Sequence, residues 1–299
     1  MKLQKQFVEN IQLSFSKEGE SWLKRLPELI AFCENQWDLK ISDPFQLSYN
    51  YVAPATRADG TELVVKLSIP GNGFRDEWEA LRLFAGKGMV SVIASDEERG
   101  ILLLEKLTPG KMLAEIDDEI TATQIAANVL GDLHHPAPEH TRIPTTRTRE
   151  ENLRRQLREN PDGKGPIPRE QMEKACDIFE RLHKSSEQQF LLHGDFHHYN
   201  VLKSGENQWR AIDPKGLVGE REYDVIQFLL NKLPETETLP VIQGRIDIFA
   251  GILHLNRERL MLWGYCHSVL ATSWTVDSDG NYDKRFYQAA TSFEQLLYN

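Results

Sequence analysis

The sequence contains few cysteines and no long apolar run, and both absences narrow the class of protein. Three cysteines, Cys33, Cys176 and Cys266, lie far apart among 299 residues. An odd number without a CxxC pair forms no disulfide framework, which favours a reducing compartment. No stretch approaches the roughly 18 apolar residues of a membrane span, and the first residues lack the apolar core of a signal peptide. We therefore expect a cytoplasmic protein that has no membrane partner.

Positively charged residues are fewer than negatively charged ones. Lysine and arginine number 35 against 45 aspartates and glutamates, so the net charge is −10. Phosphate repels such a surface, and nucleic acid is therefore a poor partner. A cationic small molecule suits this charge better, although an acidic surface most often serves only solubility. The length and the 40% apolar share predict about two domains with cores of their own.

The chain changes character near residue 108. A helix is expected over residues 18–36, and Pro27 should kink it. Two β-hairpins follow, the first turning at Asp59-Gly60 and the second at residues 97–100, with a helix between them over residues 75–88. Beyond residue 110 the pattern is mostly helical, with an expected loop over residues 160–168 and an expected helix over 221–233. Two short strands, over 201–205 and 206–212, are expected to form a hairpin. We predict an α+β fold with a β-rich lobe over 1–107 and a mostly helical lobe over 108–299.

One stretch, HGDFHHYN at residues 193–200, has the spacing of a phosphoryl-transfer site. His193 precedes Asp195 by two positions, and Asn200 follows Asp195 by five. This is the H-x-D-x-x-x-x-N spacing of a kinase base and a metal-binding asparagine. Transfer to a hydroxyl needs a carboxylate to receive the proton, oxygen ligands for Mg²⁺ and a cation for the nucleotide phosphates.

Two further pieces of that chemistry occur in the expected order. Asp213 follows a short strand and opens the loop IDPKG, which suits a second metal carboxylate. Lys66 lies in LVVKL, on the returning strand of the first hairpin, which suits a phosphate contact. Its partner would be Glu77 or Glu79 on the next helix. The joint match is far more specific than any single motif.

The histidines of the same stretch allow a different interpretation. His193, His197 and His198 could together bind zinc. Zinc usually takes a tetrahedral set of cysteine and histidine ligands with recognisable spacing, and no such partner pair lies nearby in the sequence. Histidines that shape a loop or face a substrate are the preferred interpretation.

The chain resembles the protein-kinase-like superfamily. Within it, HGDFHHYNVL followed by IDPKGLVGEREYDV is similar to the aminoglycoside phosphotransferases, in the branch of streptomycin 6-phosphotransferases and hydroxyurea-resistance kinases. The stretches LLLEKLTPG and EWEALRLFAGKG also resemble that branch. The resemblance implies a two-lobe fold whose first lobe binds nucleotide. It also implies ATP and Mg²⁺ as cofactors and a streptomycin-like antibiotic as the acceptor of the γ-phosphoryl group.

The resemblance also implies roles for the residues of the second lobe. Asp195 would be the catalytic base, and His193 would shape the loop around it. Asn200 and Asp213 would hold magnesium. Gly194 stands where protein kinases carry arginine, and Asp-Pro replaces Asp-Phe-Gly, as in the antibiotic kinases.

In the first lobe, the resemblance implies contacts to ATP. Lys66 would contact the phosphates, with Glu77 preferred over Glu79 as its ion-pair partner because Glu77 fits the register E-x-x-x-L-x-x-F. Backbone groups in the hinge that meets adenine would come from Glu105, Lys106 and Leu107. No G-x-G-x-x-G precedes Lys66, so the residues that cover the phosphates stay open.

Candidates for the acceptor site follow the metal loop and lie near the end of the chain. They are Glu220, Glu222, Trp274 and Asp277. Asp224 is expected instead to cap the start of the next helix, and a solvated loop is the preferred interpretation of Asp277. Two other functions stay open: a kinase of another small alcohol (choline, homoserine, methylthioribose or an amino sugar), and a catalytically silent nucleotide-binding module.

Overall fold

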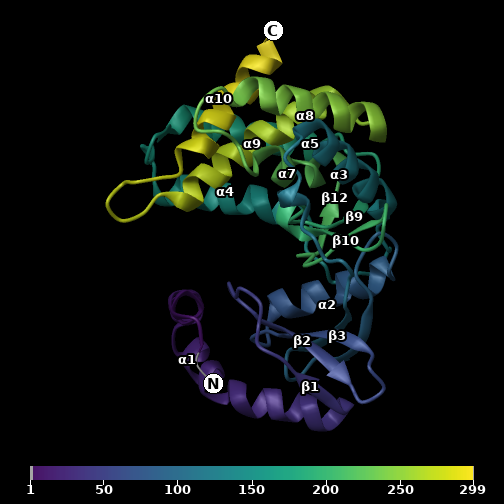
Figure 1. Cartoon of the computed structure of the whole chain (residues 1–299). Coiled ribbons are helices and arrows are strands. Elements are labelled where there is room, and N and C mark those ends of the chain that lie inside the picture. The colour runs from purple at the N-terminus through teal and green to yellow at the C-terminus, as the bar shows by residue number, and fades with distance from the viewer. Residues whose placement is uncertain (1–2, 299) are drawn as a thin grey trace. The chain divides into compact units, whose positions relative to one another are not determined.

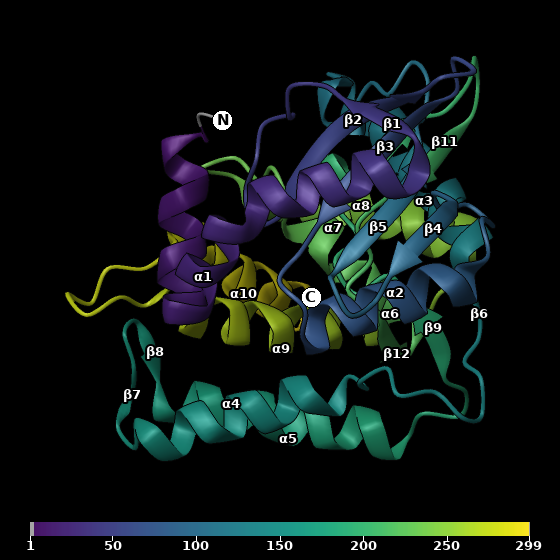
Figure 2. The same cartoon turned by 90° about the horizontal axis from the view of Figure 1, so that it is seen from below.

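The computed structural model describes residues 3–298 and divides after Gly110 into two units, which are described separately. The elements of the first unit are α1 Lys5–Trp37, β1 Leu39–Ile41, β2 Tyr51–Arg57, β3 Glu62–Leu67, α2 Asn72–Phe84, β4 Val92–Asp96 and β5 Ile101–Glu105. The strands form one antiparallel sheet in the order β1-β2-β3-β5-β4, of which Figure 1 labels the first three strands and Figure 2 labels all five. Both predicted hairpins, β2–β3 and β4–β5, are therefore confirmed.

The turn of the first hairpin forms for a local reason. The Asp59 side chain accepts a hydrogen bond from the Thr61 N–H at 2.9 Å, and Gly60 takes a φ of 85°. A glycine adopts this left-handed conformation without the steric cost of a Cβ atom. The turn sets the register that pairs Lys66 with Val52 on one side and with Leu102 of β5 on the other.

Helix α1 is longer than expected, and its break lies elsewhere. It spans Lys5–Trp37, and the residue with non-helical backbone angles is Ser16, with φ 47° and ψ −127°, whereas Pro27 lies inside the helix without such a break. The break brings the two arms together, with Phe7 and Trp22 edge to face at 6.1 Å between ring centroids. The buried face of α1 packs on the sheet and closes the core of this unit.

The second unit is mostly helical. Its elements are η1 Leu113–Glu115, α3 Glu119–Leu133, β6 His135–Pro136, α4 Arg147–Glu159, β7 Gly163–Lys164, β8 Ile167–Pro168, α5 Arg169–Lys184, β9 Phe190–Leu192, η2 His198–Asn200, β10 Val201–Lys203, β11 Trp209–Ala211, β12 Leu217–Gly219, α6 Arg221–Asp224, α7 Ile226–Leu230, α8 Thr238–Leu253, α9 Arg257–Thr275 and α10 Lys284–Tyr298. Helix α9 is buried along most of its length and contacts every helix from α4 to α8, and α10. An antiparallel sheet unit and a helical unit confirm the α+β class.

Two details of the helical unit differ from the prediction. The stretch 160–168, expected as a loop, contains the small hairpin β7–β8, which joins the neighbouring helices α4 and α5 (Figure 2). The helix expected after Glu220 is divided into α6 and α7. Among residues 3–298, no helix has the length and apolarity needed to cross a membrane.

Short strands carry the loops that matter for function. Strand β9 ends at Leu192 and lies between β12 and β6, whereas β10 begins at Val201 and pairs with β11. The stretch between β9 and β10, residues 193–200, is called the Asp195 loop here. Strand β11 ends at Ala211, two residues before Asp213. The β10–β11 hairpin expected from the sequence is confirmed, and it holds Asp213 beside the Asp195 loop.

Candidate active site

A buried carboxylate fixes the start of the Asp195 loop. Asp224 accepts hydrogen bonds from the backbone N–H groups of His193 and Gly194, both at 2.8 Å. The predicted capping role of Asp224 was wrong, because neither α6 nor α7 has a side-chain cap. His134 at the end of α3 also lies near, with its Nε2 atom 3.5 Å from Asp224 Oδ2. A buried carboxylate needs such donors, and their positions depend on the fold rather than on sequence spacing.

His193 connects the Asp195 loop to the loop that contains Asp213. Its Nε2–H donates to the Ile212 carbonyl at 2.9 Å, and its Nδ1 accepts from the Asp195 N–H at 3.3 Å. Its own carbonyl accepts from the Lys215 N–H at 2.8 Å. Burial lowers the pKa of His193, so the ring is neutral and has the one donor and one acceptor that these contacts require.

Asp195 and Asn200 lie in the same loop, with Asn200 at the end of the turn η2. The Asn200 Nδ2 group donates to the Asp195 carbonyl at 3.0 Å, and the Asn200 carbonyl accepts from the Ile212 N–H at 2.9 Å. The Asp195 side chain is 27% exposed, with Lys215 Nζ at 4.0 Å from its Oδ2 atom. Lys215 was not predicted as a site residue, because its signal in the sequence is no more than its place after Asp-Pro. Asp195 is therefore held by its backbone while its carboxylate stays accessible.

Asp213 lies next to the Asp195 loop, and its backbone has an unusual conformation. Its φ is 58°, in the left-handed region that aspartate and asparagine enter more readily than other residues with a side chain. Burial lowers the pKa of His197, and the carboxylates of Asp195 and Asp213 oppose that shift. Both carboxylates therefore act on one imidazole. Asn200 and Asp213 offer amide and carboxylate oxygens, the hard donors that suit Mg²⁺.

The three histidines of the Asp195 loop have separate partners. His193 donates to Ile212, His197 Nδ1 accepts from the Tyr199 N–H at 3.3 Å, and His198 Nδ1 donates to Asn231 Oδ1 at 2.9 Å. Burial, followed by the charges of Arg245 and Lys232, lowers the pKa of His198 to about 3. No group of three or more potential metal-binding histidines, cysteines or carboxylates occurs among residues 3–298. These contacts disfavour the zinc interpretation.

The first unit contains a buried ion pair at the predicted lysine. Lys66 on β3 and Glu77 on α2 approach to 2.5 Å between Nζ and Oε1, and the residues are 2% and 7% exposed. A buried charge pair is costly unless its geometry is good, so burial of this kind fits a functional lysine better than a structural one. Of the two carboxylates considered, the structure pairs Lys66 with Glu77.

The stretch predicted as the hinge follows β5. Glu105 Oε1 accepts from the Ser91 N–H at 2.7 Å, and the Lys106 ammonium pairs with Glu62 at 2.5 Å. Leu107 is buried. Both charged side chains are thus used within the first unit, which is compatible with contacts to a ligand through the backbone alone.

Glu220 does not have the free carboxylate expected of an acceptor contact. It is 8% exposed and accepts from Arg259 Nη2 at 2.5 Å and Nε at 2.9 Å, and from the indole Nε1–H of Trp263 at 2.8 Å. A bidentate arginine and an indole satisfy the carboxylate fully. Glu220 therefore fastens α9 to the end of β12.

The other acceptor candidates are more accessible. Glu222 is partly exposed and accepts from the Asn256 N–H at 3.1 Å. Trp274 is 42% exposed, its indole donates to Asn152 at 2.8 Å, and the guanidinium of Arg149 lies 5.7 Å from its ring centroid. Asp277 is exposed and accepts from backbone and side-chain N–H groups of Asn281, which lower its pKa. The structure does not gather these residues with Glu220 into one acidic surface.

Gly194 offers a test of how strictly the loop is held. Its φ is 79°, and a Cβ atom would lie 3.2 Å from the Leu217 Cβ atom. We expect Gly194→Ala to lower the free energy of unfolding by about 1–2 kcal/mol and to lower kcat, because the peptide next to Asp195 must shift. Gly60→Ala is the matched control, since Gly60 also has positive φ but has open space around it. Equal kcat losses in the two variants would contradict this account.

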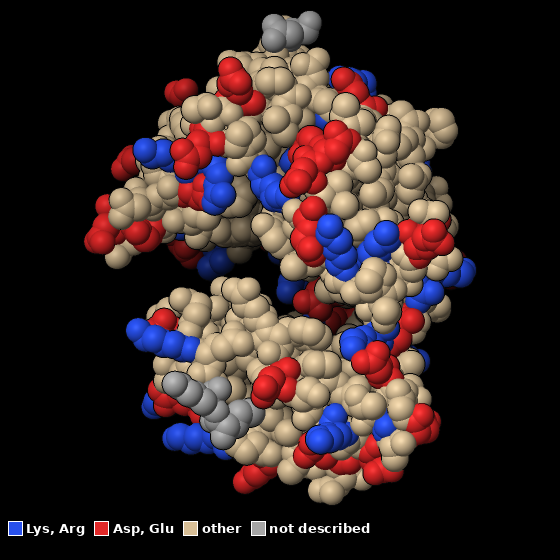
Figure 3. Space-filling view, viewed as in Figure 1, with Lys and Arg blue, Asp and Glu red and all other residues tan. Residues whose placement is uncertain are grey.

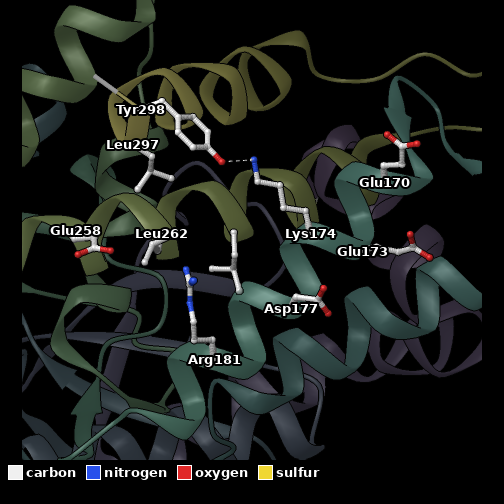
Figure 4. A pocket seen from close by; sticks show the side chains of 10 residues that line it. Glu170, Glu173, Lys174, Asp177, Arg181, Glu258, Leu262, Leu297 and Tyr298 are labelled. Atoms are coloured by element: carbon white, nitrogen blue, oxygen red, sulfur yellow. Dashed lines mark hydrogen bonds between the residues drawn. The ribbon is translucent and has the colours of Figure 1, made fainter.

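A separate hollow lies between α5, α9 and α10. The residues that line it include Glu170, Glu173, Asp177 and Glu258, with Lys174 and Arg181 among them (Figure 4). Lys174 pairs with Glu294 at 2.5 Å and donates to Tyr298 at 3.2 Å. No residue of the candidate site is among the described residues that line this hollow. We therefore do not include it in the site.

The fold and the site together define a phosphotransferase of the protein-kinase-like class. The family model described as aminoglycoside/hydroxyurea antibiotic resistance kinase matches residues 41–280, and the chain belongs to that family. It is 30% identical to streptomycin 6-kinase of Streptomyces griseus over 90% of this chain and 89% of the relative. It is 29% identical to hydroxyurea phosphotransferase of Kitasatospora aureofaciens over 87% and 76%.

A solved structure supports the fold independently. The choline kinase LicA from Streptococcus pneumoniae matches with a TM-score of 0.65 at 17% identity, covering 91% of this chain and 99% of that one. The predicted fold, family and enzyme class are therefore confirmed.

Proposed function

We propose that this kinase transfers the γ-phosphoryl group of ATP to a hydroxyl of a streptomycin-like aminoglycoside. The observation that carries the proposal is the arrangement around Ile212. Its carbonyl accepts from His193 and its N–H donates to Asn200, so the residue before Asp213 is tied to both ends of the Asp195 loop. This network supports a base and two oxygen ligands held in fixed positions, which phosphoryl transfer requires.

Each residue then has a chemical task. The Asp195 carboxylate receives the proton of the acceptor hydroxyl as the oxygen attacks phosphorus. Asn200 Oδ1 and the Asp213 carboxylate would hold Mg²⁺, which neutralises charge on the phosphates when bound. Donation from Asn200 Nδ2 to the Asp195 carbonyl supports this role, because it leaves the amide oxygen for the metal. Lys66, oriented by Glu77, supplies a cation for the nucleotide phosphates, and the backbone of residues 105–107 contacts adenine.

The proposed acceptor is supported mainly by sequence similarity to characterised relatives. The matched family is named for aminoglycoside and hydroxyurea resistance, and a relative 30% identical is a streptomycin 6-kinase. The net charge of −10 supports a cationic acceptor, although acidic and basic side chains are interspersed on the face drawn in Figure 3. Asp277 is the accessible carboxylate that we propose for acceptor contacts. Glu222 is left out because it contacts Asn256 at the start of α9, whereas Asp277 follows the end of that 19-residue helix. Glu220 is left out because Arg259 and Trp263 already satisfy it.

A panel of acceptors tests this proposal. ATP consumption should be fastest with streptomycin, and its KM should rise with ionic strength, because salt screens an accessible charge pair. The KM for ATP should change less. Hydroxyurea, choline and homoserine are the comparators. Turnover with only a neutral or zwitterionic acceptor would contradict the aminoglycoside part of the proposal and leave the kinase part intact.

Hydroxyurea is the second candidate acceptor. A hydroxyurea phosphotransferase is 29% identical over 87% of this chain, nearly as similar as the streptomycin kinase. Hydroxyurea is small and uncharged, so its KM should be independent of salt. The salt dependence therefore separates the two candidates even if both are phosphorylated.

A further inference from the structure

The far end of the Asp195 loop is attached to α7 by a second buried contact. His198, the first residue of the turn η2 that ends in Asn200, donates from Nδ1 to Asn231 Oδ1 at 2.9 Å. Its ring also stacks on Phe228, with 3.8 Å between centroids and 18° between planes. His198 is 1% exposed. The ring is thus fixed both in position and in rotation.

The partner of His198 is itself held by a buried cation. Arg245 on α8 is 1% exposed, and its Nη1 group lies 2.7 Å from the Asn231 carbonyl and 2.8 Å from the Phe228 carbonyl. Its Nε–H donates to Glu119 of α3 at 2.6 Å, which balances the charge. The carbonyls at a helix end lack partners within the helix, so the guanidinium ends α7 at a defined residue.

These contacts form one continuous path from α8 to the turn that carries Asn200. Arg245 holds the end of α7, the Asn231 side chain at that end holds His198, and His198 begins the turn η2. Among the described contacts between the His198 ring and the end of α7, the hydrogen bond to Asn231 is the only directional one. We therefore expect this hydrogen bond to be the weakest point of the path. A shift of this hydrogen bond would act on Asn200 through the turn η2 that both residues share, whereas Asp195 is held nearer the other end of the loop through His193.

We infer that His198 and Asn231 are positioning residues for Asn200 and set the affinity of the enzyme for its catalytic metal ion. The inference rests on the proposed function, since it takes Asn200 as a metal ligand. Loss of the hydrogen bond should raise the concentration of Mg²⁺ needed for activity. It should change kcat at saturating Mg²⁺ much less, because Asp195 and Asp213 keep their own contacts.

The test uses His198→Phe, which keeps the ring on Phe228 but removes the N–H donor, and Asn231→Leu, which removes the acceptor. Each should raise the apparent Mg²⁺ activation constant about three- to tenfold, the effect of one hydrogen bond. The dissociation constant for Mn²⁺, measured without turnover by electron paramagnetic resonance on the nucleotide-bound enzyme, should rise by the same factor. The double variant should be no worse than the worse single variant, because both remove the same bond. His183→Phe is the matched control. The His183 side chain is also only 5% exposed, stacked on a phenylalanine and hydrogen bonded, but it belongs to α5.

In the control His183→Phe, the melting temperature should fall while the Mg²⁺ activation constant stays unchanged. An Mg²⁺ constant within about twofold of wild type in both single variants would overturn the inference. The inference would also be overturned if the double variant showed the product of the two single rises in the Mg²⁺ constant. An equal rise in the Mg²⁺ constant of His183→Phe would overturn it as well. If either single variant fails to fold, the other carries the test.

Asn200→Ala separates failure of this inference from failure of the proposed function. A raised Mg²⁺ constant in Asn200→Ala with none in His198→Phe and Asn231→Leu would overturn the inference alone. No rise in Asn200→Ala would overturn the metal assignment, and with it the basis of the inference.

Discussion

Asp195→Ala is expected to lower kcat by about 10²–10⁴, because removal of a general base typically has an effect of this size. ATP affinity should stay close to wild type, since the carboxylate acts on the acceptor hydroxyl and not on the nucleotide. The loop should keep its shape, because His193 and Asn200 hold residue 195 through its backbone. Initial rates of ADP release give kcat, and calorimetry gives the dissociation constant for ATP.

Asp177→Ala is the control for this prediction. Asp177 is an exposed carboxylate on α5 that lies outside the candidate site, so its loss reports the effect of one negative charge alone. Turnover of Asp195→Ala close to that of Asp177→Ala would contradict the assignment of the base.

Asp213→Asn should have the second large effect. Asparagine tolerates the left-handed backbone at this position, with its φ of 58°, so the substitution removes the charge without straining the loop. Charge stabilisation by a bound metal ion contributes several kcal/mol, so we expect kcat to fall at least about 10²-fold. The activity that remains should need more Mg²⁺ than wild type does. Titration of activity with Mg²⁺ and with Mn²⁺ measures both effects.

If the loss of activity in Asp213→Asn came from damage to the fold, the melting temperature of the variant should fall as well. Asp213→Asn should melt near the wild-type temperature, whereas Asp213→Ala should melt lower because alanine enters the left-handed region less readily. Unchanged Mg²⁺ dependence in Asp213→Asn would show that this carboxylate is not a metal ligand.

Much of the fold was predictable because its signals are local. The turn at Asp59-Gly60, the strands around it and the helical periodicity after residue 110 each depend on neighbouring residues. The break in α1 was not predictable in this way. Pro27 is the residue that sequence rules select, but the chain turns at Ser16, where the contact between Phe7 and Trp22 favours a return of the helix on itself.

The candidate site also contains residues whose roles the sequence predicts and residues whose roles it does not. The spacing of His193, Asp195 and Asn200 could be read directly, because one short loop contains all three. The partners of Glu220 and Asp224 could not. Asp224 binds backbone that lies about 30 residues earlier, and Glu220 binds Arg259 39 residues later. A carboxylate that a distant element satisfies has the same sequence signal as one that faces a substrate.

The most direct test of the central claim follows the phosphoryl group itself. Wild-type enzyme is incubated with γ-labelled ATP, Mg²⁺ and streptomycin, and the products are separated and weighed by mass spectrometry. We predict that streptomycin gains the label and the mass of one phosphate group, and that Asp195→Ala gives at least about 10²-fold less labelled product in the same time. Consumption of ATP without label on streptomycin or hydroxyurea, or labelling that is independent of Asp195, would contradict the account.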